Sequence, residues 1–260
     1  MKYQTPPGKF GLPIIGETLN WLLNQPSFSE TRYKKYNSDI FKTSIFGQKF
    51  IFVRGEELCQ FILQHENQYF QNSPLPNIKK LFGKKAISNQ TGEEHRSRRK
   101  ILKKVFTNRY LDIQTKTINE NTQRYFQKWE KYSNFEWYPE FRDYAFNIAC
   151  ELIIGKHNAY LNQQLKTWSQ GLFSFNPRVV NKALKSRENI LSELDKIIVS
   201  PSQRESALTL MLEAEVEGEK LGIEEIKDQL LNLLAAGHET LASGLTAICL
   251  VLSQNPSILE

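Results

Sequence analysis

Residues 230–252 have the sequence LLNLLAAGHETLASGLTAICLVL, an apolar run interrupted at its centre by His-Glu-Thr at 238–240. Acidic residues precede the run, where negative charge suits a helix N-terminus, and Pro256 follows it. We therefore predict one long helix over residues 223–254. A helix that is apolar on all sides is buried in lipid or inside a large domain. Its length permits a membrane span, but Glu239 at the midpoint makes insertion costly. A central core helix is the favoured interpretation.

Small residues recur at three- and four-residue steps through the centre of this helix and therefore share one face. They are Ala236, Gly237, Thr240, Ser243, Gly244 and Ala247. Such a face has two interpretations: close packing of another helix, or a flat ligand lying in a shallow groove. In the second case Glu239 and Thr240 are a candidate pair for handling protons. The residues by themselves leave both interpretations open.

The segment Ala235–Thr240, AAGHET, resembles the oxygen-activation motif of the cytochrome P-450 family, [AG]-G-x-[DE]-T. The resemblance implies a mainly α fold of that family, with a small N-terminal β hairpin region and the long central helix. It implies that Thr240 and Glu239 are catalytic, Thr240 holding oxygen through its hydroxyl and Glu239 relaying protons by cycling between its two forms. Ala236 and Gly237 would bind the cofactor, heme b, and Gly237 would leave room for oxygen.

The composition indicates a globular protein. Hydrophobic residues make up 40% and charged residues 24% of 260 residues, and the formal net charge is +6. The chain does not begin with a positively charged segment followed by an apolar one, so we expect no secretory signal peptide. Cys59, Cys150 and Cys249 are too far apart for a zinc or redox pair. We expect buried thiols in a reducing compartment, no metal site from these residues, and a cytoplasmic protein.

The N-terminal part divides into three predicted segments. Residues 1–23 are rich in proline and glycine and predict a rigid, non-helical arm, and PPGKFGLPIIGET resembles the family's proline-rich hinge. Only five residues precede that hinge, so no transmembrane anchor is expected. Residues 39–54 predict a β hairpin around Gly47-Gln48, a pair that suits a type II′ turn. Residues 70–90 lack periodicity and predict a long loop, which in the family covers the substrate pocket.

Residues 91–106 begin with Thr-Gly-Glu-Glu, a capping-box pattern, and predict a helix. Between positions 79 and 104, ten Lys or Arg stand against two Glu, a local net charge of +8. A solvated basic face is the plain interpretation. Nucleic-acid binding is disfavoured because no aromatic residues interleave and no such motif is present. The family's propionate-binding pattern W-x-x-x-R, with His replacing Trp in some branches, matches His95 and Arg99. The other cations would face an acidic electron donor such as a ferredoxin.

The middle of the chain predicts further helices. Two lie within residues 111–154 and end at Gly155. An amphipathic pair over 161–173 and 179–199 corresponds to the helices that roof the active site in the family. Another short helix is predicted over 206–215, followed by a turn at Glu-Gly-Glu.

The resemblance covers the chain from Pro6 to Glu260. A family member continues with an E-x-x-R helix and a loop whose cysteine ligates heme iron, and no cysteine here has the required flanks. The chain therefore resembles the N-terminal half of a heme-thiolate monooxygenase, inactive by itself. It is most like soluble cyanobacterial relatives of the retinoid and sterol hydroxylases, which implies dioxygen and a large apolar substrate such as a retinoid, terpenoid or fatty acid. A non-catalytic helical remnant and a basic helical binding protein without heme remain alternatives.

Overall fold

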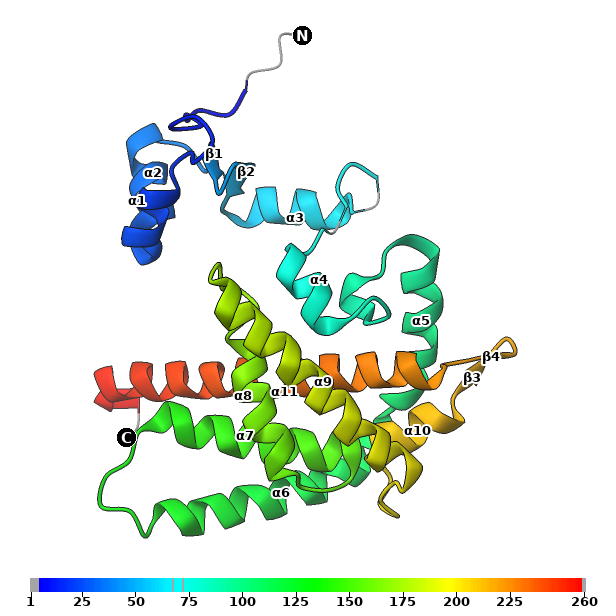
Figure 1. Cartoon of the computed structure of the whole chain (residues 1–260). Coiled ribbons are helices and arrows are strands. Elements are labelled where there is room, and N and C mark those ends of the chain that lie inside the picture. The colour runs from blue at the N-terminus through cyan, green and yellow to red at the C-terminus, as the bar shows by residue number, and fades with distance from the viewer. Residues whose placement is uncertain (1–4, 67, 72, 259–260) are drawn as a thin grey trace. The chain divides into compact units, whose positions relative to one another are not determined.

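The computed structural model describes residues 5–66, 68–71 and 73–258. The chain divides into two compact units, residues 1–72 and residues 73–260 (Figure 1). Helices dominate, and the two small sheets are each a two-stranded hairpin. The predicted mainly α fold with a small N-terminal hairpin is confirmed.

The first unit begins with an arm that runs beside the hairpin. The Lys42 N–H donates to the Pro7 carbonyl over 2.8 Å. Gly16 has φ +62°, and a Cβ there would lie 2.2 Å from the Ser44 carbonyl oxygen, so only glycine fits. The arm ends in a helix, α1 (Thr18–Leu23), so the prediction of a wholly non-helical arm over 1–23 is wrong for its last turn. Residues 1–4 lie outside the described residues.

The hairpin consists of β1 (Ile40–Ile45) and β2 (Gln48–Val53), which pair antiparallel. Its turn differs from the predicted type II′ turn at Gly47-Gln48. Phe46 has φ 51° and Gly47 has φ 73°, and two positive φ values define a type I′ turn. Gln48 already pairs with Ile45 in the ladder, so the turn lies one residue earlier.

Short helices complete the first unit. They are η1 (Gln25–Ser27), α2 (Phe28–Tyr36) and α3 (Glu56–Gln64). Phe28 and Tyr33 of α2 pack with Phe41 and Ile45 of β1 in a small aromatic core. This core gives the unit its own hydrophobic centre.

The second unit contains the remaining elements. They are α4 (Pro76–Phe82), η2 (Ile87–Asn89), α5 (Gly92–Val105), α6 (Asn108–Trp129), α7 (Trp137–Ile154), α8 (Ala159–Ser169), α9 (Pro177–Val199), α10 (Ala207–Glu213), β3 (Glu215–Val216), β4 (Glu219–Lys220), α11 (Ile223–Gln254) and η3 (Pro256–Ile258). The predicted helices of the middle region are confirmed, including the end of α7 at Gly155, whose φ is 74°. The predicted turn after α10 forms the tip of the β3–β4 hairpin.

Two predictions about residues 70–106 are corrected. Residues 70–90 contain α4 and η2 and are not a long loop, because tertiary contacts fix this segment: the Trp168 indole N–H donates to the Leu81 carbonyl over 3.0 Å. Helix α5 forms as predicted over 91–106, but the Thr91 side chain makes no capping hydrogen bond. Glu94 instead accepts a hydrogen bond from Gln90 over 3.2 Å, so the capping box does not form.

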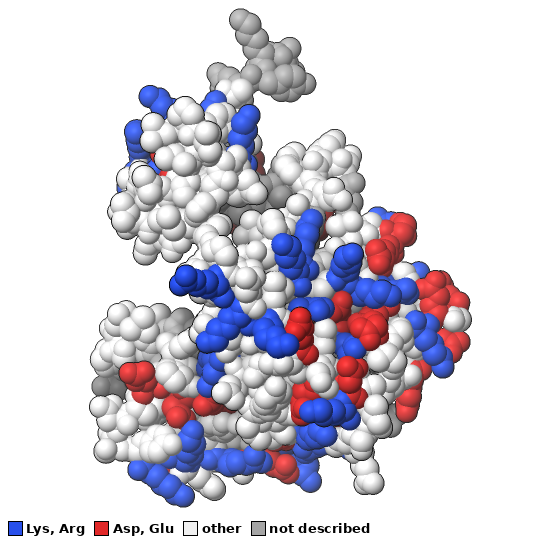
Figure 2. Space-filling view, in the orientation of Figure 1, with Lys and Arg blue, Asp and Glu red and all other residues white. Residues whose placement is uncertain are grey.

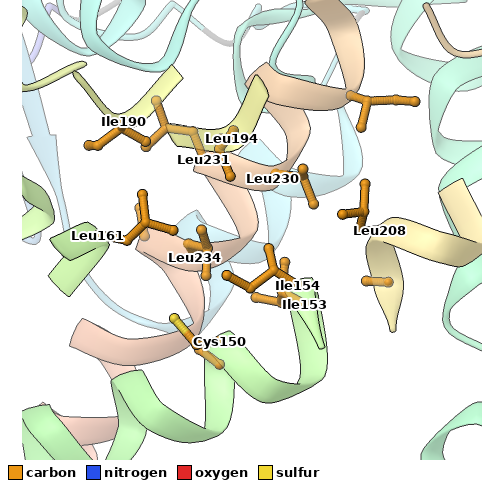
Figure 3. Close-up of a cluster of buried hydrophobic side chains, with 14 of the residues drawn as sticks. Cys150, Ile153, Ile154, Leu161, Ile190, Leu194, Leu208, Leu230, Leu231 and Leu234 are labelled. Carbon is orange, nitrogen blue, oxygen red and sulfur yellow. The ribbon is translucent and has the colours of Figure 1, made fainter. Parts of the chain in front are cut away.

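The long helix α11 has the predicted ends, Ile223 and Gln254. Its first half lies in the main hydrophobic core, where Leu230, Leu231 and Leu234 pack with side chains of α7, α8, α9 and α10 (Figure 3). Its second half is largely exposed, with Leu250 57% accessible, so the prediction of burial on all sides holds only for the first half. By length and composition α11 is also the one described helix that could span a membrane.

The three cysteines differ in burial. Cys150 is fully buried (Figure 3), Cys249 is half-buried and Cys59 is exposed. The prediction that all three are buried thiols is therefore wrong for Cys59, which lies on the outer face of the short helix α3.

Candidate functional site

The predicted small-residue face of α11 is open to solvent. Its members are all exposed: Ala236, Gly237, Thr240, Ser243, Gly244 and Ala247. The Thr240 hydroxyl donates to the Ala236 carbonyl one turn earlier, over 2.6 Å. This bond uses the hydroxyl hydrogen and leaves the oxygen able to accept from a ligand or water. The structure thus presents Thr240 at the centre of an accessible, sterically shallow surface.

Two glycines of this helix have different surroundings. A Cβ on Gly237 would lie 3.5 Å from the Cβ of Ala149 and 3.9 Å from Ile153 Cδ1, both on α7. A Cβ on Gly244 would meet nothing within 4 Å. A methyl group on Gly237 would therefore make ordinary van der Waals contact with α7, whereas one on Gly244 would meet open space. Its predicted role of leaving room for oxygen stays a prediction.

Glu239 lies beside Thr240 in sequence but contacts α7. Its Oε1 accepts from Arg142 Nε over 2.7 Å and also from Arg142 Nη2, and its Oε2 accepts from the Tyr138 hydroxyl over 2.8 Å. Nε2 of His238 lies 3.4 Å from Oε1. The contact with His238 and the hydrogen bonds from Arg142 and Tyr138 hold the pKa of Glu239 well below its usual range, although partial burial acts in the opposite direction.

Adjacent helical residues point about 100° apart, because one turn takes about 3.6 residues. Glu239 accordingly faces α7 while Thr240 faces solvent. The two predicted catalytic residues are neighbours in sequence, but in this state no hydrogen bond joins their side chains within the described part of the chain. The surroundings of Glu239 favour its charged form, and its predicted role in relaying protons stays a prediction.

His238 explains how the polar centre of α11 is accommodated. Its ring is buried, Nδ1 lies 2.6 Å from the Leu234 carbonyl oxygen, and the ring meets Phe146 edge-on at 5.5 Å between centroids. Both polar residues, His238 and Glu239, thus turn toward α7, whereas the small residues remain on the open face. Helix α7 supplies hydrogen-bond donors to Glu239, and the Leu234 carbonyl of α11 itself faces Nδ1 of His238.

The second predicted pair lies on α5. Arg99 is exposed and His95 is half-buried, and neither forms an ion pair with any residue that the structure describes. Arg98, in contrast, lies 2.8 Å from Glu219 and 2.8 Å from the buried Glu225 at the start of α11. The two neighbouring arginines therefore differ. Arg98 joins α5 to α11 through an ion pair, whereas the guanidinium of Arg99 is available to a ligand.

Sequence reasoning missed two polar residues of α11, Asp228 and Gln229, whose hydrogen bonds hold the segment before α5. Gln229 of α11 is fully buried; its amide donates to the Lys85 carbonyl over 2.7 Å and its oxygen accepts from the Ile87 N–H over 3.1 Å. Asp228 accepts from the Lys85 N–H over 3.1 Å and pairs with Arg187 of α9. These contacts fix the chain that leads into α5. Two polar residues in the first turns of an apolar helix were the available signal.

Lysines and arginines surround α4 and α5. Figure 2 shows them over the region that α4, α5 and α9 occupy in Figure 1, with acidic side chains nearer to β3 and β4. The exposed cations of residues 79–104 that lack an ion pair within the described chain are Lys79, Lys80, Lys84, Lys85, Arg99, Lys103 and Lys104. This surface carries unneutralised positive charge.

Comparison with known proteins places these features in a family. The Cytochrome P450 family model matches residues 6–180 and 165–260. This chain belongs to the cytochrome P450 family. Among curated relatives, the putative cytochrome P450 120 of Synechocystis sp. is 39% identical over 267 residues, which cover 98% of this chain and 60% of that protein. Human cytochrome P450 26B1 is 27% identical over 276 residues, covering 100% of this chain and 54% of the relative.

Solved structures agree with the cytochrome P450 assignment. Retinoic acid-bound cyanobacterial CYP120A1 is 39% identical with a TM-score of 0.88, covering 97% of this chain and 61% of that chain. A cytochrome P450 with bound myristic acid has a TM-score of 0.79 at 19% identity, which supports the fold alone. The chain spans about 60% of the length of the cyanobacterial relatives.

The described part of this cytochrome P450 chain offers no obvious metal ligand set. No group of three or more His, Cys, Asp or Glu residues is placed to hold a metal ion within the described residues. Burial raises the pKa of the Cys150 thiol, so this cysteine is a poor source of a thiolate. The predicted heme-binding residues His95 and Arg99 form no ion pair among the described residues, and their role stays a prediction.

Arg142 and Tyr138 were not predicted from the sequence as site residues. The signal was an arginine inside the largely apolar and aromatic stretch of α7, FRDYAFNIAC, but its partner could not be read from local spacing. The structure shows that partner to be Glu239.

Proposed function

We propose that the full-length protein that carries this sequence is a heme-dependent monooxygenase, which inserts one atom of dioxygen into a large apolar substrate. The open small-residue face of α11, with the Thr240 hydroxyl at its centre, carries the proposal. A face built only for helix packing needs no exposed hydroxyl at this position. Membership of the cytochrome P450 family supports the reaction class.

Heme b, when bound, supplies the iron chemistry that activates dioxygen. Arg99 and His95 would hold a heme propionate. The Arg99 guanidinium is exposed and forms no ion pair with the residues that the structure describes, and its fork of N–H donors matches a carboxylate. Ala236 and Gly237 would lie against the flat cofactor, because both are exposed and neither has a bulky side chain. The axial thiolate is not assigned to any of the three cysteines of this chain.

Thr240 and Glu239 have separate tasks in this proposal. With heme bound, the Thr240 hydroxyl would be placed to give up its bond to Ala236 and to donate a hydrogen bond to dioxygen on the open face. Glu239 provides negative charge on the other side of the same turn and assists proton delivery from solvent. Neither task requires a change in the course of α11.

The substrate class proposed here is large and apolar, with a retinoid as the first choice. The supporting relative is the CYP120A1 structure, 39% identical and described with bound retinoic acid. Terpenoid and fatty-acid substrates are the comparison classes: β-amyrin 28-monooxygenase of Medicago truncatula is 28% identical, and a structural neighbour contains myristic acid.

An acidic electron-donor protein such as a ferredoxin is the proposed partner. The exposed, unpaired cations of α4 and α5 supply a complementary surface, which accelerates encounter with an acidic protein. We place the protein in the cytoplasm, since the ion pair of Glu239 with Arg142 and the packing of His238 on Phe146 fit an α11 that packs against α7 in a globular domain.

The test uses the full-length protein supplied with heme and a ferredoxin reductant system. We expect a carbon monoxide difference spectrum of the thiolate type and hydroxylation of retinoic acid in preference to myristic acid and a triterpene. Binding of a retinoid without heme incorporation would support a helical binding protein instead. A folded full-length protein that retains no heme would refute the proposal.

A further inference from the structure

We infer that Arg142 and Tyr138 are positioning residues that hold Glu239 on the α7 side of α11 as a fixed anion. On this view Glu239 acts by attracting and orienting water or a protonated carrier, and it does not itself donate a proton from a neutral carboxyl group. The catalytic meaning of this inference rests on the proposed function, but the contacts that support the inference all lie within this chain.

The geometry around the carboxylate is one-sided. The polar groups of α7 that meet it donate to both oxygens: Arg142 Nε over 2.7 Å and Arg142 Nη2 on one oxygen, and the Tyr138 hydroxyl over 2.8 Å on the other. A neutral carboxyl group would have to place its own hydrogen on an oxygen that already accepts. Donation to both oxygens therefore stabilises the charged form and opposes protonation.

His238 is a further titratable neighbour of Glu239. It lies on the same helix, with Nε2 3.4 Å from Oε1 and Nδ1 2.6 Å from the Leu234 carbonyl oxygen. Its Nε2 is buried and makes no hydrogen bond among the described residues; because Nδ1 carries the hydrogen that faces the carbonyl, Nε2 can donate to the carboxylate only from an imidazolium ring. The titratable groups facing Glu239 are thus Arg142 and Tyr138 from α7 and His238 from α11. The pKa of Glu239 is lowered, and the bond to Glu239 raises the pKa of Tyr138.

Burial makes the arrangement more than a surface ion pair. The Arg142 side chain is 13% exposed and the Glu239 side chain 30% exposed, so solvent screens the pair only in part. The planar guanidinium reaches one oxygen with two nitrogen atoms, which fixes the orientation of the carboxylate as well as its charge. The carboxylate cannot turn toward the Thr240 side without losing these bonds. Protons for the open face then arrive through water.

The experiment follows the Glu239 carboxyl group directly in the 260-residue chain. Infrared or carbon-13 NMR titration, with Glu239→Gln identifying the signal, reports the charge of the carboxyl group. An ordinary glutamate is half-protonated at pH 4.5. We expect Glu239 to remain ionised at that pH. In Arg142→Met its titration should move up toward the ordinary value, and Tyr138→Phe should produce a smaller shift in the same direction.

The matched control is Arg124→Met, which removes an arginine that lies 3.9 Å from Glu151 and does not contact Glu239. It should leave the Glu239 titration unchanged. If Arg142→Met fails to fold, Arg142→Gln serves in its place, since glutamine removes the charge and keeps a polar group that can hydrogen-bond. Titration of the unmutated Glu239 near pH 4.5, or an unmoved titration in the folded Arg142 variant, would overturn the inference. Loss of heme binding in the full-length protein would refute the proposed function and leave this titration unaffected.

Discussion

Replacing Thr240 by valine separates the two interpretations of the open face of α11. Valine keeps the branched shape of threonine and removes only the hydroxyl. In the structure this hydroxyl is exposed and donates to the Ala236 carbonyl of its own helix over 2.6 Å. The variant therefore loses a local bond to a carbonyl that the helix already satisfies. We expect the free energy of unfolding to change by no more than about 0.5 kcal/mol, as at other exposed positions.

The functional effect should be far larger than the structural one. A hydrogen bond to a charged ligand is worth about 1.5–3 kcal/mol, so its loss shifts the competition between product and peroxide release by roughly ten- to a hundredfold. The assay uses the full-length protein with its reductant and measures reductant consumed, product formed and hydrogen peroxide released. Reductant consumption should continue, product should fall, and peroxide should account for the difference.

A matched control lies six residues further along the same helix. Thr246 donates to the Ala242 carbonyl over 2.8 Å in the same way, but it is half-buried and outside the small-residue face. Thr246→Val should leave the ratio of product to reductant unchanged. Glu239→Gln should instead slow turnover as a whole, because the Thr240 hydroxyl is still present. An unchanged ratio in Thr240→Val would show that Thr240 is a packing residue and that the proposed mechanism is wrong.

Three further predictions concern heme retention, the hydrogen bonds of Gln229 and the pH dependence of stability. Arg99→Ala should weaken heme retention in the full-length protein by about 1.5–3 kcal/mol, measured by heme transfer to an acceptor protein, whereas Arg96→Ala on the same exposed helix should not. Gln229→Leu should lower the free energy of unfolding by about 2–4 kcal/mol in urea, since two half-buried backbone groups lose their partner, while exposed Gln163→Leu stays within about 0.5 kcal/mol. Because its pKa is lowered, Glu239 stabilises the fold above pH 4.5 and loses that contribution as the pH falls, so the stability gap between wild type and Glu239→Gln should narrow on acidification.

The bounds of α11 were predictable from the sequence because the determinants are local. Acidic residues open the helix, an uninterrupted helical pattern continues it, and Pro256 ends it. The segment before α5 was not predictable for the opposite reason. Leu81 accepts hydrogen bonds from Trp168 and Arg187, which lie far along the chain, and such contacts override a weak local preference for helix.

The capping box predicted at Thr91 does not form, because the glutamates that follow it bind other side chains. Glu94 accepts from Gln90 over 3.2 Å, and Glu93 pairs with Arg96. The pattern of residue types was present, but other partners were within reach of both carboxylates. The hairpin turn shifted for a related reason, since Gln48 gains a ladder partner when Phe46 and Gly47 form the turn. Local sequence patterns predict the presence of a helix or hairpin more reliably than they predict the hydrogen bonds at its ends.

The candidate site shows the same division between local and distant information. A motif within α11 was enough to single out Thr240, and the structure places it on an accessible face. The environment of Glu239 depends on Arg142, whose bond spans a separation of 97 residues. Spacing within one helix cannot encode that pair, so the sequence suggested a titrating carboxyl group where the structure holds an ion pair.

The two neighbouring residues can do different work because one helical step turns the chain by about 100°. That rotation puts Glu239 against α7, where donors keep it charged, and Thr240 at the open face, where its oxygen stays free to accept. The Glu239 carboxylate is held in one orientation by α7 and does not compete with the Thr240 hydroxyl for a ligand on the open face. If the Glu239 side chain shared the face of Thr240, its charge would repel another anion about 4 Å away by roughly 4 kcal/mol at an effective dielectric constant of about 20. Paired with Arg142 on α7, it leaves the open face free of that repulsion.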